Sequence, residues 1–127
     1  MELTILQEFL PAFILDYFEV KEFYKLGNVS TKQDEYFLCL DERNLLPSGY
    51  LNINYESKGF LPSSKVQDFP IRGKAVYLVI RRRRWRHKQT HKEITRDYSL
   101  VAEGSRLTQE LSDFLKGTGR DPRRYDK

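Results

Sequence analysis

The N-terminal part of the chain has the pattern of a helix followed by two strands. Across Leu3–Phe18 the apolar residues recur at helical spacing and form a wide stripe, which predicts a helix that packs on a core. Pro11 falls inside this stretch, so it either kinks the helix or begins a second short helix at its first turn. The apolar runs Val20–Leu26 and Glu35–Leu40 flank turn-forming residues 27–31, which predicts a hairpin or two neighbouring strands.

The C-terminal part alternates strands with turns and ends in a helix. Residues 44–54 predict a loop that leads into a short extended piece, 50–55, and Lys65–Ile71 predicts a strand. The next strand, Lys74–Arg86, is apolar on both faces at its centre and basic at its end, and Ile94–Leu100 returns beside it. The two strands predict a long hairpin whose tip is Trp85–Lys92. After it, Ser105 is a suitable N-cap for a helix that ends at Gly117.

These elements predict a single α+β domain over residues 1–117. It has an N-terminal helical segment, a small antiparallel sheet with a long basic β-hairpin, and a C-terminal helix. We expect an acidic helix-plus-strands part at 1–56, the basic hairpin part at 57–104, the helix at 105–117, and a tail or linker at 118–127. Apolar residues make up 39% of the 127-residue chain and aromatic residues 13%, which favours a packed fold over disorder.

Charge divides the chain into two unlike halves. Residues 1–71 hold 6 Lys and Arg against 11 Asp and Glu, a net charge of −5. Residues 72–127 hold 16 against 7, a net charge of +9. Such an asymmetry is typical of a protein with a polyanionic partner, and it points to nucleic acid.

The basic half is concentrated in one run with interleaved aromatic character. Its candidate DNA-contacting residues are Arg81, Arg82, Arg83, Arg84, Trp85, Arg86, Lys88, Lys92 and Arg96. In a regular strand, Arg81, Arg83 and Trp85 would share one face, and the other face would hold Arg82, Arg84 and Arg86. Such a ribbon, basic on both faces, could lie in a groove or straddle a phosphate backbone. Trp85 could stack on a base or wedge against sugar. Three alternatives stay open: a nuclear-localisation-type charge run, arginines that pair with the acidic half, and Trp85 as a packing residue.

Residues for catalysis or metal binding are sparse. Cys39 is the single cysteine, so neither an internal disulfide nor a cysteine zinc site can form, and it is expected to be a buried small hydrophobe. His87 and His91 lack the further ligands that zinc needs. Phosphate-loop and nucleophile motifs are missing, and the acid pairs at 34–35 and 41–42 are expected to be solvated strand ends. We therefore predict no enzyme activity, no metal and no cofactor.

No stretch approaches the ~20 apolar residues that a membrane span requires. The apolar N-terminus lacks the basic region of a signal peptide and carries Glu2, Glu8 and Asp16. The sequence thus predicts a cytoplasmic protein without a membrane partner.

One longer stretch resembles a known family. Residues 67–85, which run QDFPIRGKAVYLVIRRRRW, resemble the N-terminal region of bacterial insertion-sequence transposases of the ISL-three superfamily, most closely the ISAon-one type. In that region an Asp-hydrophobic-Pro and a Gly lead into a strand that ends in Arg-Arg and an aromatic residue. Residues 96–110 are similar to the same type. The resemblance covers roughly residues 55–116, about half of the chain.

The resemblance implies a DNA-binding part of a transposase without catalysis of its own. In the wider superfamily this region is a zinc ribbon, but Ser57–Phe60 and His87–Thr90 hold no cysteine where its two cysteine pairs would stand. It therefore implies a ribbon-like hairpin that is held by packing, with Arg81–Trp85 as the DNA-contacting strand. The family's catalytic carboxylates belong to a later domain.

The partners implied are double-stranded DNA, at the ends of the element, and a downstream catalytic transposase polypeptide. Two other functions stay open. One is a protein-interaction module, in which the N-terminal apolar helix docks a partner and the arginines bind an acidic surface. The other is RNA binding.

Overall fold

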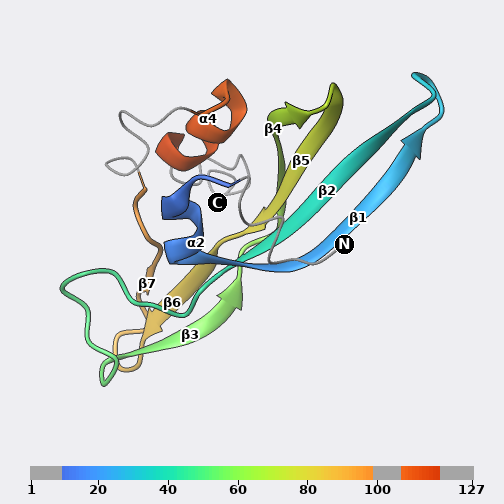
Figure 1. Ribbon diagram of the computed structural model, residues 1–127. Helices are drawn as coiled ribbons and strands as arrows, with labels where there is room; N and C mark the ends of the chain where they lie inside the picture. Colours follow the sequence, from blue (N-terminus) through green and yellow to red (C-terminus); the bar gives the residue numbers. More distant parts are fainter. Residues whose placement is uncertain (1–9, 99–106, 118–127) are drawn as a thin grey trace.

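The computed structural model describes residues 10–98 and 107–117, and this part of the chain is mostly β (Figure 1). A four-stranded sheet has the strand order β1-β2-β5-β4, and a three-stranded sheet has the order β3-β6-β7. Two short helices flank them. In chain order the elements are α2 (Ala12–Tyr17), β1 (Phe18–Asn28), β2 (Gln33–Glu42), β3 (Tyr55–Phe60), β4 (Ser64–Ile71), β5 (Lys74–Arg81), β6 (Arg83–His87), β7 (Glu93–Ile94) and α4 (Gln109–Gly117).

The larger sheet is built from two hairpins, of which the sequence pattern predicts the first. β1 and β2 pair antiparallel, and the Asn28 side chain accepts hydrogen bonds from the backbone N–H groups of Ser30 and Thr31 in the turn. β4 and β5 form a second hairpin. Its two-residue turn places Arg72 at φ 52° and Gly73 at φ 77°, and two left-handed residues suit the right-handed twist of a hairpin.

The two hairpins join through a parallel pair, β2 with β5. The prediction of a small, purely antiparallel sheet is therefore wrong in this respect, although the α+β class holds broadly. Parallel strands occur mostly where both faces of a sheet are covered, and β5 is apolar on both. On the face toward the helices, Leu78 and Ile80 are fully buried, together with Leu40 of β2.

The helices cover one face of the larger sheet (Figure 1). α2 begins directly after Pro11, its N-cap residue, and ends where β1 begins, so Pro11 precedes this helix and does not kink it. Residues 1–9 of the predicted helix lie outside the described residues. The core beneath the helices comprises Leu10, Ile14, Phe18, Leu38, Leu40, Val66, Leu78, Ile80, Tyr98, Leu111 and Leu115.

Helix α4 packs against the edge strand β4. The hydroxyl of Thr108 accepts a hydrogen bond from the backbone of Leu111, so Thr108 caps the helix. The same hydroxyl donates to the carbonyl of Gln67 at 2.6 Å, and Glu110 accepts from the Gln67 backbone. The predicted N-cap, Ser105, lies outside the described residues, and the helix begins at Gln109, later than predicted, because residues 107 and 108 are not helical.

The opposite face of the sheet carries an aromatic row. Tyr24, Phe37 and Tyr77 stack across three strands with ring centroids 5.0 and 5.3 Å apart, and the ammonium of Lys65 lies 4.8 Å from the Tyr77 ring. Cys39 lies on this face and is half-buried, whereas the sequence led us to expect a buried residue. Its partial burial raises the pKa of the thiol. No helix among the described residues is long and apolar enough to cross a membrane.

The predicted strand 74–86 is two strands that belong to different sheets. β5 ends at Arg81 in the larger sheet and β6 begins at Arg83 in the smaller one. Buried positions alternate up to Ile80 and Arg82, and the next buried residue is Trp85, so the alternation shifts by one position at the junction. Arg81 and Arg83 lie over the same Phe60 ring, but Arg81 is exposed and Trp85 is buried, so the predicted common face of Arg81, Arg83 and Trp85 does not continue across the junction.

The predicted long hairpin is also shorter than expected. β6 pairs with β7 at only two positions, Trp85 with Ile94 and Arg86 with Glu93, and its other neighbour is β3. The expected extended piece 50–55 begins as a strand only at Tyr55, since residues 52–54 form a turn. Residues 99–100 of the predicted return strand lie outside the described residues.

Candidate nucleic-acid interface

Two acids at the end of β2 receive the beginning of the arginine run. Parallel pairing sets Asp41 beside Arg81, and the carboxylate accepts two hydrogen bonds from the guanidinium, at 2.7 Å from Nε and 2.6 Å from Nη2. These hydrogen bonds raise the pKa of Arg81 above its ordinary value. The guanidinium also lies 4.1 Å from the centre of the Phe60 ring. Arg81 is thus engaged on both sides by its own chain.

Glu42 is only 1% exposed and lies at the centre of a polar cluster. It accepts hydrogen bonds from the backbone N–H of Arg83, at 2.7 Å, and from the hydroxyl of Tyr98. Arg96 forms an ion pair with it at 3.6 Å. Burial raises the pKa of Glu42, and the two hydrogen bonds and nearby arginines oppose that rise. Burial, followed by the charge of Glu42, also raises the pKa of Tyr98.

Three more arginines hold backbone segments together. Arg82 is 3% exposed, donates to the carbonyl of Arg96 and lies over the ring of Tyr98. Arg83 donates to the carbonyl of Glu42 at 3.2 Å and to the Ser57 hydroxyl at 2.7 Å. Arg96 donates to a loop carbonyl, that of Leu45, and its guanidinium lies over Tyr17. These side chains cross-link the two sheets and the loop after β2.

Trp85 is a core residue of the smaller sheet. Its side chain is 1% exposed, and its indole N–H donates to the Asn44 side-chain oxygen at 2.8 Å. A buried ring cannot stack on a base, so the expectation that Trp85 contacts nucleic acid does not fit this structure. The packing alternative describes it instead.

Arg84 and Arg86 remain on the accessible side of β6. Arg84 forms an ion pair with Glu93 at 3.4 Å and also donates to the carbonyl of Lys58. Arg86 forms an ion pair with Glu56, also at 3.4 Å. Both carboxylates are more than two-fifths exposed, so water competes with these pairs.

The turn between β6 and β7 adds two exposed lysines. Lys88 and Lys92 form no ion pair with any residue in the described ranges. Arg81 is also nearly half exposed, but its close two-point pair with buried Asp41 holds its charge. Of the nine predicted contact residues, four therefore carry a charge that an anion can reach without breaking such a pair. We call Arg84, Arg86, Lys88 and Lys92 the basic edge.

The two segments where the resemblance implies the cysteine pairs of a zinc ribbon, Ser57–Phe60 and His87–Thr90, lie on or directly after the paired strands β3 and β6. Ser57 pairs with Trp85, and Tyr55 pairs with His87 across the same two strands. The Tyr55 and His87 rings meet edge to face at 5.0 Å, and Nδ1 of His87 accepts hydrogen bonds from two backbone groups of its turn. Within residues 10–98 and 107–117, no group of three or more His, Cys, Asp or Glu could hold a metal ion. Aromatic packing occupies this end of the sheet.

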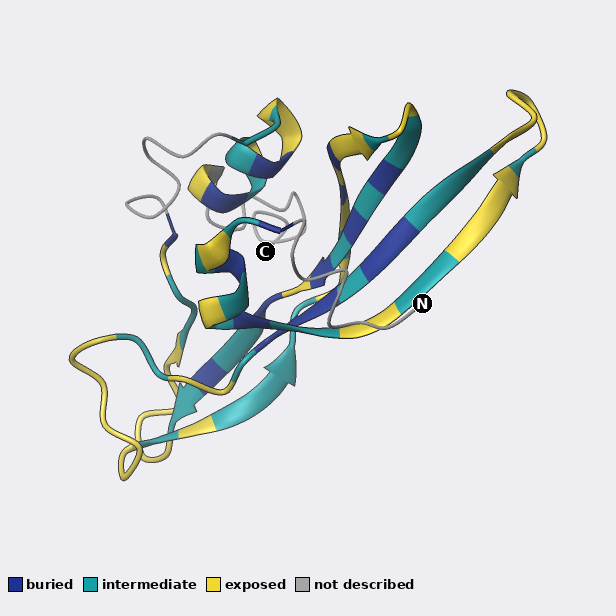
Figure 2. Ribbon diagram, viewed as in Figure 1, coloured by how far each residue is buried: buried dark blue, intermediate teal, exposed yellow. Residues whose placement is uncertain are grey.

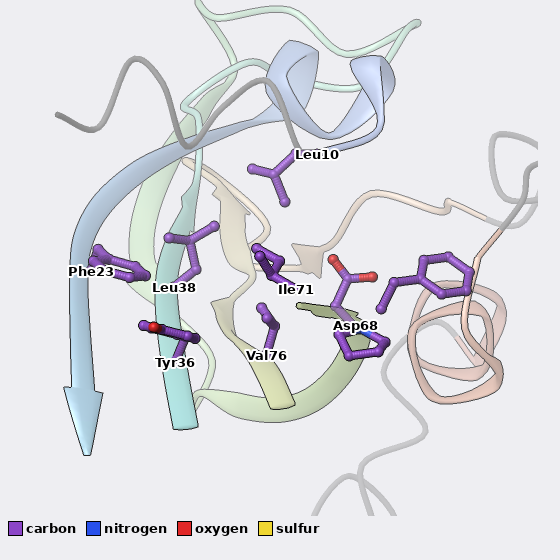
Figure 3. A pocket seen from close by; sticks show the side chains of 9 residues that line it. Leu10, Phe23, Tyr36, Leu38, Asp68, Ile71 and Val76 are labelled. Carbon is purple, nitrogen blue, oxygen red and sulfur yellow. The ribbon is translucent and has the colours of Figure 1, made fainter. Parts of the chain in front are cut away.

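A small apolar pocket of about 130 Å³ lies on the helix-covered face of the larger sheet, away from the basic edge (Figure 3). Its lining is apolar except for the carboxyl of Asp68 and the Tyr36 ring; the residues are Leu10, Phe23, Tyr36, Leu38, Asp68, Phe69, Pro70, Ile71 and Val76. Burial raises the pKa of Asp68, which is 8% exposed. A single buried acid in an apolar wall does not suit a polyanion.

The sequence missed the residues that receive the arginines. Asp41 and Glu42 were expected to be ordinary solvated carboxylates, and the structure buries both. An available signal was their position: two adjacent acids end an apolar strand in a chain that contains an unbalanced arginine run. Asn44, the partner of Trp85, gave no comparable signal.

The chain matches no protein-family model, no curated protein and no solved structure. Its function is therefore inferred from its own residues and their contacts.

Proposed function

We propose that this chain binds duplex DNA as the non-catalytic N-terminal or accessory part of a bacterial transposition system, at the ends of the element. The observation that carries the proposal is the basic edge: four cationic side chains follow one strand and its turn. Phosphate contacts of this kind supply most of the affinity of a DNA-binding module. The resemblance of residues 67–85 to transposase N-terminal regions supports the choice of DNA and of a transposition system.

The carboxylates that pair with the basic edge can readily be exchanged for DNA phosphates. The Arg84–Glu93 and Arg86–Glu56 pairs are long and exposed, and such surface pairs contribute about 0–1 kcal/mol. A phosphate can replace each carboxylate as the acceptor and release condensed counterions from the DNA. The arginines that are engaged internally have a different role, since they fix the strand that carries the edge.

Strand cleavage is assigned to a partner polypeptide. Phosphodiester chemistry of this type uses two metal ions held by clustered carboxylates. In the described part of the chain, Asp and Glu residues form no such cluster, and those near the basic edge pair with arginine. The proposed partner is a downstream catalytic transposase polypeptide.

The decisive experiment is the salt dependence of binding, measured by fluorescence anisotropy with a labelled duplex that carries an element end. Four neutralised phosphates predict a slope of log K against log salt near −3.6, from ~0.9 per contact. The double variant Arg84→Gln and Arg86→Gln should make the slope shallower by ~2. A matched control, Lys21→Gln and Lys25→Gln, removes two exposed charges from β1 and should leave the slope unchanged.

Several results would count against the proposal. Absence of duplex binding at low salt, or a flat salt dependence, would refute it. Equal weakening by the β1 control would show that only overall charge matters. Tighter binding to single-stranded RNA of equal length would select the RNA alternative. For catalysis, the chain alone should leave the duplex uncut in magnesium or manganese, and the downstream protein should add cleavage.

A further inference from the structure

Two turns meet at the far end of the smaller sheet, beside the basic edge (Figure 1). The backbone N–H of Lys88 donates to the carbonyl of Asn54 at 2.9 Å, which joins the turn after β6 to the loop before β3. A second hydrogen bond, from Asn54 to the carbonyl of Leu51 at 3.0 Å, closes the loop's own turn. Figure 2 shows both turns as exposed. The hydrogen bond between Lys88 and Asn54 holds these exposed turns side by side at the surface of the molecule.

Apolar side chains project from this surface. Tyr50 is 40% exposed, Leu51 is 60% exposed and Ile53 is 74% exposed. Single exposed apolar residues are ordinary, but three within four positions form a patch that marks an interaction site. We call these three residues the apolar tip.

The apolar tip rests on a row of aromatic rings. The Tyr50 ring meets Tyr55 edge to face at 5.2 Å, and Tyr55 meets His87 in the same manner at 5.0 Å. Tyr55 and His87 are also paired in the sheet. Tyr50 therefore anchors one side of the tip, and the turn hydrogen bond from Asn54 to Leu51 closes the other, which reduces the ordering cost of inserting it into a partner.

The charge around the tip identifies the chemistry of that partner. Residues 44–55 and 87–92 contain no Asp or Glu, whereas Lys88 and Lys92 are exposed there. Asn52 and Gln89 add exposed amides. Apolar wedges set among lysine, asparagine and glutamine are the residues with which proteins enter the minor groove of DNA and separate base steps.

We infer that Leu51 and Ile53 insert into the minor groove of the bound duplex and bend it, while Lys88 and Lys92 hold the flanking phosphates. This inference rests on the proposed duplex-binding function and adds the mode of contact. An anionic membrane would also accept apolar and basic groups together. The duplex is favoured because the cationic side chains continue from the turn along β6, through Arg86 to Arg84, which suits a rod of phosphates.

The test measures bending separately from binding. Energy transfer between dyes at the two ends of a short duplex should rise when the parent chain binds, because bending brings the ends together. The variant Leu51→Ser with Ile53→Ser should bind with the salt slope unchanged, an affinity lower by about tenfold or more, and no rise in energy transfer. Its melting temperature should stay unchanged, since both side chains are exposed.

A control variant removes apolar residues from the other end of the molecule. Leu26 and Val29, near and in the β1–β2 turn, are 53% and 91% exposed. Their replacement by serine should change neither affinity nor bending. Lys88→Gln with Lys92→Gln should instead make the salt slope shallower by ~2.

The outcomes separate this inference from the proposed function. Salt-dependent duplex binding without bending, or bending that survives the Leu51→Ser and Ile53→Ser changes, overturns the inference and leaves duplex binding intact. No duplex binding overturns both. Tighter binding to phosphatidylserine vesicles than to the duplex, lost in the same variant, would assign the apolar tip to a membrane and also overturn the inference.

Discussion

Asp41 and Arg81 form a two-point ion pair across the parallel strands β2 and β5, with both nitrogen–oxygen distances below 2.8 Å. The acid comes from the acidic half of the chain and the arginine from the basic half. Asp41 is buried, whereas the Arg81 side chain is nearly half exposed. Some of the charges that make the two halves unlike therefore pair with each other inside the fold. The net charge of the basic half thus overstates the positive charge that a partner can contact.

Arg81→Ala should reduce stability without changing the salt slope of DNA binding. The substitution leaves a buried carboxylate without its strongest donor, so the free energy of unfolding should fall by about 1–3 kcal/mol in urea denaturation. Arg84→Ala is the matched control. It loses an exposed pair and should change stability by no more than ~0.5 kcal/mol while making the slope shallower. The opposite pattern in the two variants would contradict the assigned roles.

Tyr98→Phe tests the cluster around Glu42. The substitution removes one hydrogen bond to a buried carboxylate, so we expect a loss of about 1–3 kcal/mol. Glu42→Ala should cost more, about 3–5 kcal/mol, because it leaves buried arginine without its acid. If the residues form one cluster, the double variant should lose less than the sum of the two, as measured in a double-mutant cycle. Strict additivity would show that they act independently.

Trp85 is the single tryptophan of the chain, so fluorescence excited at wavelengths that tyrosine does not absorb reports on it alone. Because the indole is buried, acrylamide should quench it weakly in the folded chain and strongly only after unfolding. Saturating duplex should leave both intensity and quenching nearly unchanged. Strong quenching by DNA, with unchanged stability, would revive base stacking by Trp85. Trp85→Ala should lower stability by about 3–5 kcal/mol.

Asp68→Asn should change the pH dependence of stability. Burial raises the pKa of Asp68 in the folded chain above the ordinary value of 3.8. At pH values between the ordinary and the raised pKa, the folded state therefore binds more protons than the unfolded state. Stability therefore falls as pH rises from about the ordinary value through the raised one. Asparagine cannot ionise, so the variant should be more stable than the parent at neutral pH, and the gain should shrink in acid. Thermal melts of both chains across pH check this; a gain of equal size at all pH values would exclude the charge as its cause.

The local elements were predictable because their signals are local. The apolar runs of β1 and β2 act over a few residues, and the structure has that hairpin. Strands were also predicted at 65–71 and from 74 onward, but not that these two strands pair with each other. The helical spacing of Leu111 and Leu115 likewise marks α4, where both residues are buried. Neighbouring residues alone are sufficient for these assignments.

The partners of the arginine run were not predictable, because they lie far away in sequence. Asp41 and Glu42 meet residues about forty positions later, and they do so only because β2 and β5 pair in parallel. The shift in alternation at Arg82 arises from the passage of the backbone between two sheets, which periodicity does not reveal. The candidate site therefore narrowed from nine residues to the four of the basic edge.

The parallel pairing of β2 with β5 has a consequence for how the chain folds during its synthesis on the ribosome. Synthesis delivers β1 and β2 first, and hairpins form faster than contacts that close long loops. Asp41 and Glu42 are thus available before the arginine run leaves the ribosome, itself a dense polyanion. We expect pulse-labelled hydrogen exchange during refolding to protect β1 and β2 before β6. The acids that end β2 would then bind the first guanidiniums of the arginine run as they emerge, in competition with ribosomal RNA.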